Sequence, residues 1–114
     1  MWSVEFYEKA NGVKPVEDFL NELDNKMRAK AIRDINLLKE FGNTLREPYS
    51  KHVGDGIFEL RIQMAGDITR ILYFFYIEKR IILTNGFIKK TNKTPKSEID
   101  RALKYKFEYI NERR

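Results

Sequence analysis

Two arginines are the first candidates for chemistry, because each interrupts a segment that otherwise has the pattern of a β-strand. Arg61 lies in the alternating segment 57–63, and Arg70 lies in the almost wholly apolar segment 68–76. An unpaired charge is costly to bury, so Arg70 must either pair with a carboxylate or face a functional site, and we expect the site. Arg61 follows Glu59 by two positions on the same face of one strand, so these two side chains could instead pair with each other.

Three lysines follow the next predicted strand and extend this cationic set. Lys89, Lys90 and Lys93 lie just past segment 80–87, so one sheet could bring them close to the two arginines. RNA cleavage without a metal uses the substrate's own 2′-hydroxyl as nucleophile and needs a base, an acid and cations beside the phosphate. Guanidinium groups supply fixed charge, and a lysine crowded by other cations can act as a base because its pKa falls. The same lysines could equally be solvated side chains of a turn.

The only histidine is a further candidate for proton transfer. His52 lies beside Lys51 in segment 43–55, which contains Pro48 and Gly54 and is predicted to be a loop. A neutral imidazole could accept a proton at physiological pH. A histidine in a surface loop often has no catalytic role, so both interpretations stay open.

Positive charge is concentrated near the end of the chain. The net charge is +5, and residues 1–88 carry 13 basic and 13 acidic side chains, whereas residues 89–114 carry 9 and 4. A localised cationic surface attracts polyanions, which favours nucleic acid as the partner, although a solvated lysine-rich helix would have the same composition. Tyr105 and Tyr109, beside Lys104, could stack on bases or could pack on the sheet or on a protein partner. The lysines expected to bind RNA are Lys51, Lys89, Lys93 and Lys104.

Several classes of site are excluded by composition and spacing. The chain has one histidine, no cysteine and only scattered carboxylates, so it lacks the ligand spacing of a metal site, and we expect no cofactor. It also has no P-loop, GxSxG or GxGxxG motif. No apolar run is long enough for a membrane span and no signal peptide is evident, so we expect a cytoplasmic protein without a membrane partner.

The periodicity predicts a single α+β domain over residues 1–114. Segment 2–7 alternates as a strand, and two helices follow, the first beginning near Pro15 and the second capped by Asp24. Three strands at 57–63, 68–76 and 80–87 and a last helix after Thr94-Pro95 complete the order β-α-α-β-β-β-α. We therefore expect an N-terminal strand and a helical hairpin packed on a small, mainly antiparallel sheet. In the last helix Ile99, Leu103, Lys106 and Ile110 share a face, which predicts a thin apolar stripe and loose docking.

Segments 57–61 (IFELR), 70–73 (RILY) and 83–95 (LTNGFIKKTNKTP), followed by Glu98-Ile99 and Ala102, carry a resemblance to a known family. In this order they resemble the RelE/ParE toxin superfamily, in particular its phage-derived, HigB-type branch. The resemblance implies a RelE-like fold and the toxin of a type II toxin–antitoxin system, neutralised by a cognate antitoxin that in this branch is usually a helix-turn-helix protein.

The resemblance further implies a metal-independent endoribonuclease that cuts mRNA in the ribosomal A site and so inhibits translation. By position, Arg61, Arg70, Lys90 and His52 would be its catalytic residues. The match has two departures, because Ile57 and Glu59 stand where RelE carries lysines and no tyrosine closely follows Lys90. The general base therefore stays open among His52, Glu59 and a lysine from elsewhere.

Three alternatives to the endoribonuclease follow from the same residues. The first is a ParE-like inhibitor of DNA gyrase, which would share the fold without a nuclease site. The second is a nucleic-acid-binding module in which the cations only contact phosphate, with a steep salt dependence. The third is a structural domain with solvated lysines.

Overall fold

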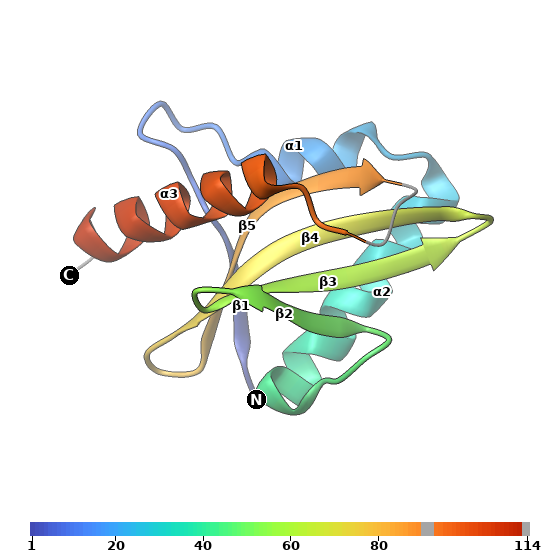
Figure 1. Ribbon diagram of the computed structural model, residues 1–114, viewed down its shortest axis with the longest axis horizontal. Helices are drawn as coiled ribbons and strands as arrows, with labels where there is room; N and C mark the ends of the chain where they lie inside the picture. The colour runs from blue at the N-terminus through green and yellow to red at the C-terminus, as the bar shows by residue number, and fades with distance from the viewer. Residues whose placement is uncertain (90–92, 113–114) are drawn as a thin grey trace.

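The computed structural model describes residues 1–89 and 93–112, which form a mixed sheet with helices on both faces (Figure 1). The strands are β1 (Ser3–Phe6), β2 (Ser50–Gly54), β3 (Ile57–Met64), β4 (Asp67–Tyr76) and β5 (Arg80–Lys89). The helices are α1 (Pro15–Glu22), α2 (Asn25–Phe41) and α3 (Lys96–Glu112), with a short 3-10 turn, η1, at Gly42–Thr44.

The five strands have the order β1-β5-β4-β3-β2, so the apolar strand β4 is central. β1 is parallel to β5, and the other neighbouring strands are antiparallel. This arrangement confirms the predicted α+β class and the predicted order of strands and helices.

Strand β2 corrects the prediction that segment 43–55 is a loop. Its residues pair with β3 in the antiparallel direction, with Ser50 opposite Leu60 and His52 opposite Phe58. Its sequence, SKHVG, has no apolar alternation, because β2 is an edge strand with mostly exposed or partly exposed side chains. Backbone pairing with β3 therefore holds this segment as a strand, and local sequence gives no sign of it.

Helices α1 and α2 cover one face of the sheet and enclose the larger hydrophobic core. Pro15 occupies the first turn of α1, and the Asp24 carboxylate caps α2 by accepting a hydrogen bond of 2.9 Å from the backbone N–H of Met27. Arg28 joins the two helices, since its Nε donates to the carbonyl of Leu20 at 2.9 Å. The predicted helical hairpin is thereby confirmed.

Helix α3 covers the opposite face of the sheet, but not with the residues predicted from periodicity. Its buried residues are Ala102, Tyr105 and Tyr109, whereas the predicted stripe of Ile99, Leu103 and Ile110 is only partly buried. The two tyrosines pack on the sheet, so they are not available to stack on bases. Leu103 and Ile110 of the predicted stripe do pack against the hydrophobic core on this face, but the prediction left out the two tyrosines, which are buried in it.

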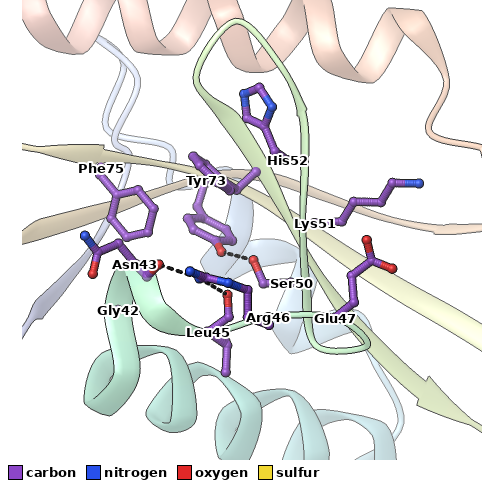
Figure 2. A pocket seen from close by; sticks show the side chains of 11 residues that line it. Gly42, Asn43, Leu45, Arg46, Glu47, Ser50, Lys51, His52, Tyr73 and Phe75 are labelled. Atoms are coloured by element: carbon purple, nitrogen blue, oxygen red, sulfur yellow. Dashed lines mark hydrogen bonds between the residues drawn. The ribbon is translucent and has the colours of Figure 1, made fainter.

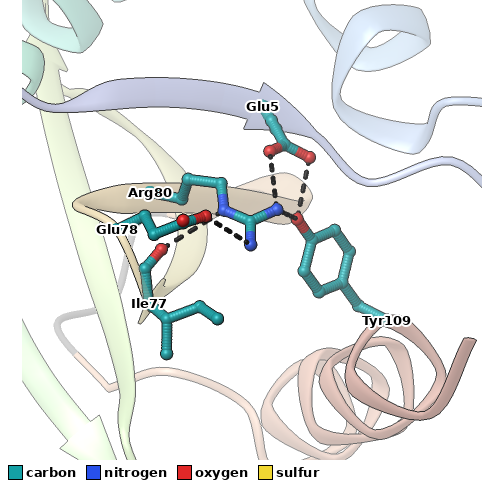
Figure 3. A network of polar contacts seen from close by, with 5 residues as sticks. All are labelled: Glu5, Ile77, Glu78, Arg80 and Tyr109. Atoms are coloured by element: carbon teal, nitrogen blue, oxygen red, sulfur yellow. Dashed lines mark hydrogen bonds and ion pairs between the residues drawn. The ribbon is translucent and has the colours of Figure 1, made fainter. Parts of the chain in front are cut away.

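Polar contacts fix the C-terminal half of α3 to the sheet (Figure 3). The Tyr109 hydroxyl donates to Glu5 Oε1 at 2.9 Å and accepts from Arg80 Nη1 at 3.1 Å. Nearer the start of the chain, Tyr7 stacks on Tyr105 with ring centroids 4.6 Å apart. Strands β1 and β5 and helix α3 thus share one network, which holds α3 across the sheet.

One carboxylate in α2 is buried without a strong partner. The Asp34 side chain is 3% exposed, and its oxygens lie 3.8 Å from Lys30 Nζ and 3.9 Å from Arg33 Nε, too far for hydrogen bonds. Burial raises the pKa of Asp34, and the two cations oppose this shift only in part. The charged carboxylate at neutral pH is therefore a cost to the folded state.

Asp34→Asn is expected to increase the free energy of unfolding near neutral pH. A raised pKa means that the folded state binds the proton more tightly than the unfolded chain, so stability falls as the pH rises through the folded pKa. The gain should disappear at about pH 3, where Asp34 itself is protonated. Urea unfolding of both proteins at the two pH values measures this, and an equal gain at both would contradict the assignment.

Candidate active site

The two arginines predicted to be functional lie opposite each other on the face of the sheet that α3 covers. Arg61 of β3 and Arg70 of β4 are direct register partners in an antiparallel pair. Facing residues in such a pair have closely spaced Cβ atoms, so two like charges there would destabilise the sheet unless a counter-charge lies between them.

Glu59 is that counter-charge. Its Oε2 lies 3.3 Å from Arg61 Nε, and its Oε1 lies 3.8 Å from Arg70 Nε. The hydroxyl of Thr94 donates a hydrogen bond to the same Oε1. One carboxylate therefore contacts two guanidinium groups and a hydroxyl, and we call these four residues, Glu59, Arg61, Arg70 and Thr94, the arginine cluster.

The two arginines differ in their access to solvent. The Arg70 side chain is 0% exposed and that of Glu59 is 1% exposed, whereas the Arg61 side chain is 13% exposed. Burial lowers the pKa of Arg70, Glu59 raises it, and Arg61 lowers it again. Glu59 thus balances the buried charge of Arg70, and Arg61 is the arginine of the cluster that a ligand can reach.

Lys93 and Thr94, which precede α3, cover Arg70. Arg70 Nη1 donates to the carbonyl of Lys93 at 3.2 Å, and Thr94 is buried beside it. The helix start is fixed in turn to β5, since Asn85 Nδ2 donates to the backbone carbonyl of Glu98 at 3.2 Å and to its Oε1 at 2.9 Å. The position of α3 therefore determines how deeply the arginine cluster is buried.

The predicted lysines lie at different distances from this cluster. Lys93 is exposed beside it, and Lys89 ends β5, opposite Ile68 and two positions from Phe87, the β5 partner of Arg70. Lys51 is opposite Glu59 in the register of the edge strand, and Lys104 is exposed on α3. Lys90 lies outside the described residues.

His52 does not join the arginines. It is opposite Phe58 in the register, and Phe58 packs with the core under α2, so His52 lies on the other face of the sheet from Glu59 and Arg61. Its ring lies 4.9 Å from that of Phe58, and its Nε2 accepts from the backbone N–H of Gly56 at 3.3 Å. The expectation of one site that contains both His52 and the arginines is therefore wrong. Because β2 is not predictable from local sequence, the face on which this side chain lies is not predictable either.

Two members of the arginine cluster have contacts that the sequence does not predict. The sequence indicates Glu59 as a possible partner of Arg61 and as a possible base, but it gives no sign of the contact with Arg70. It indicates Thr94 only as the residue before Pro95 and α3. A threonine just before a helix gives no signal for a contact with a strand far away in the sequence, so only the tertiary structure identifies it.

The cluster can hold a phosphate without a metal. The described residues contain no group of three histidine, aspartate or glutamate side chains that could hold a metal ion. None of the described helices is both long and apolar enough to cross a membrane. The guanidinium of Arg61 can bind a phosphate oxygen. The buried Glu59, which also contacts Arg70, holds Arg61 in position.

Comparison with known protein families gives a match. Residues 18–106 match the model of a family described as Phage derived protein Gp49-like (DUF891), and this segment covers more than half of the chain and includes the whole arginine cluster. No curated protein matches the chain.

Proposed function

Because the chain belongs to the phage-derived Gp49-like family, within the toxin-like RelE/ParE group, we propose that it is a toxin that cuts mRNA on the ribosome. Its reaction would be metal-independent attack of the RNA 2′-hydroxyl on the adjacent phosphate in the A site, which breaks the bond from phosphorus to the 5′-oxygen and leaves a 2′,3′-cyclic phosphate and a protonated 5′-hydroxyl. Its partners would be the ribosome with its mRNA and a cognate antitoxin. The first candidates for the antitoxin are helix-turn-helix proteins, as in the HigB-type branch. Translation in the cytoplasm would be its target.

The observation that carries this proposal is that Arg61 is both accessible and held in a fixed position. It is the accessible guanidinium of a preorganised cluster, fixed at 3.3 Å from Glu59 on a rigid strand. Lys93, whose backbone carbonyl accepts from Arg70, is exposed beside the cluster. Fixed cations that meet the growing charge of a phosphorane are the main source of rate in phosphate chemistry without a metal.

The roles follow from accessibility. Arg61 would contact the scissile phosphate, and Arg70, which is buried, would act as a positioning residue through Glu59. Glu59 is poorly suited to be the base, because it is 1% exposed and its oxygens already face two arginines and the Thr94 hydroxyl. We assign proton transfer to the lysines of segment 89–93, with Lys90 as the first candidate. The position of His52 on the other face of the sheet argues against a role of His52 in this transfer.

The test uses purified protein and ribosomes paused on a defined mRNA, with and without EDTA. Primer extension should show a new 5′ end in the A-site codon, at the same rate in both conditions. For this comparison the ribosomes are chemically cross-linked before EDTA is added. A cleavage step that then still requires a divalent metal would overturn the metal-free mechanism. Intact mRNA at all protein concentrations would overturn the nuclease assignment.

One observation favours the gyrase inhibitor as a second candidate. The charge of Arg70 is buried and balanced by Glu59, so part of the cationic face predicted from the sequence is not presented to a ligand. A supercoiling assay with DNA gyrase and the same protein preparation separates the two functions. Inhibited supercoiling with intact mRNA would select the gyrase inhibitor.

A further inference from the structure

A second concave site lies on the opposite face of the sheet from Arg61 and Arg70, between η1 and β2 (Figure 2). Its cavity has a volume of about 260 Å³. Ordinary small-molecule pockets begin at roughly 300 Å³, so this one suits a single flat ring with one attached group. The proposed cleavage reaction does not use it.

The cavity has an aromatic wall. Phe58, Tyr73 and Phe75 all line it, and Phe58 and Phe75 are partly exposed. The ring of Phe58 lies 5.6 Å from that of Tyr73 in a stacked arrangement and 5.1 Å from that of Phe75 in an edge arrangement. Such a wall offers both faces and edges of rings, which nucleobases contact favourably and with little regard to sequence.

A pair of buried hydroxyls lies at the base of the cavity. Ser50 Oγ and Tyr73 Oη share a hydrogen bond, and both residues line the cavity (Figure 2). Burial raises the pKa of Tyr73 to about 12, so its phenol keeps its proton at physiological pH. Two hydroxyls carry two protons and their mutual bond uses one of them, so the second remains to donate to a carbonyl or ring nitrogen of a ligand.

The rim of the cavity is cationic and partly preorganised. Arg46 Nη1 donates to the carbonyl of Asn43 at 2.8 Å and to that of Leu45 at 3.5 Å. Its Nε and Nη2 have no hydrogen-bond partner among residues 1–89 and 93–112, so they remain to bind an anion. Lys51 also lines the cavity, but it lies opposite Glu59 in the register, so its side chain points toward the other face of the sheet, and Glu47 is the one acidic residue among the described lining residues.

His52 also lines the cavity. Its Nε2 accepts from the backbone N–H of Gly56, so Nδ1 is the ring nitrogen left to donate to a ligand. The rim thus offers the guanidinium of Arg46 and an imidazole N–H beside an aromatic wall. This is the combination that recognises a phosphate attached to a flat heterocycle.

We propose that this pocket binds one nucleotide of an RNA strand, with its base against Phe58 and Phe75 and its phosphate at Arg46. The buried hydroxyl pair would read an acceptor atom on the base edge. An aromatic side chain of a protein partner could fill the same wall, but it would leave both the cationic rim and the hydroxyl donor without a ligand.

The test is binding of free nucleoside 5′-monophosphates to the isotope-labelled full-length protein, followed by NMR. The amide signals of Lys51, His52 and Phe58 should shift and saturate. Arg46→Ala should weaken binding about tenfold, since a charge-assisted contact to phosphate is lost. The matched control is Lys39→Ala, which removes one positive charge from an exposed position on α2 and should leave the affinity unchanged.

Three outcomes would overturn the proposal. Inorganic phosphate that gives the same shifts at the same concentration would show that no base is recognised. Tighter binding of N-acetyltryptophanamide than of any nucleotide would show that the pocket takes a protein side chain. Equal weakening by Arg46→Ala and Lys39→Ala would show that only net charge matters. None of these measurements involves ribosomes or cleavage, so the nuclease proposal stands or falls separately.

Discussion

Glu59→Gln is expected to lower the free energy of unfolding by about 3–5 kcal/mol, because it leaves a buried guanidinium without its counter-charge. Arg70 is 0% exposed, so solvent cannot take over the role of the carboxylate there. Glutamine keeps the shape of glutamate, so the loss reports the charge and not a cavity. Urea unfolding followed by circular dichroism measures it.

The control is Glu78→Gln, which removes an exposed carboxylate from its ion pair with Arg80. That side chain is 80% exposed, so its loss should cost less than about 1 kcal/mol. A double-mutant cycle with Arg70→Met isolates the buried pair and should give a coupling free energy of about 1 kcal/mol or more. Additive losses in the cycle would mean that Glu59 and Arg70 do not interact in solution.

Arg61→Ala is expected to slow mRNA cleavage on the ribosome by about 100-fold or more, the usual effect of losing one fixed group that stabilises the transition state. Because Arg61 lies at the accessible edge of the cluster, the variant should remain folded, and its unfolding curve must be measured beside its activity. Single-turnover cleavage at saturating ribosomes gives the rate of the chemical step separately from binding.

Two further variants make this result specific. Arg61→Lys keeps the charge but loses the planar, two-pronged contact with phosphate, so its rate should fall between those of the wild type and Arg61→Ala. Arg33→Ala removes an arginine that is 74% exposed on α2, and its rate should equal that of the wild type. A folded Arg61→Ala variant with the wild-type rate would remove Arg61 from the site.

The sequence by itself determined the features that depend on neighbouring residues. Strand alternation, the Asp24 cap and Pro15 at the start of α1 are local signals, and the elements they predicted are present. The proximity of Arg61 and Arg70 was also predictable, because consecutive antiparallel strands joined by a short turn must pair. The resemblance to the RelE/ParE group was visible in the motifs between residues 57 and 102. The match over residues 18–106 places the chain in the phage-derived Gp49-like family of that group.

Only the tertiary structure decided which side chains share a site. The face on which His52 lies depends on the register of β2, and a shift of one residue would place it on the other face. The burial of Arg70 depends on Lys93 and Thr94, which join the cluster only when α3 docks across the sheet. Pairing between segments distant in the chain leaves no trace in local periodicity, and for that reason the composition of the site could not be derived from the sequence.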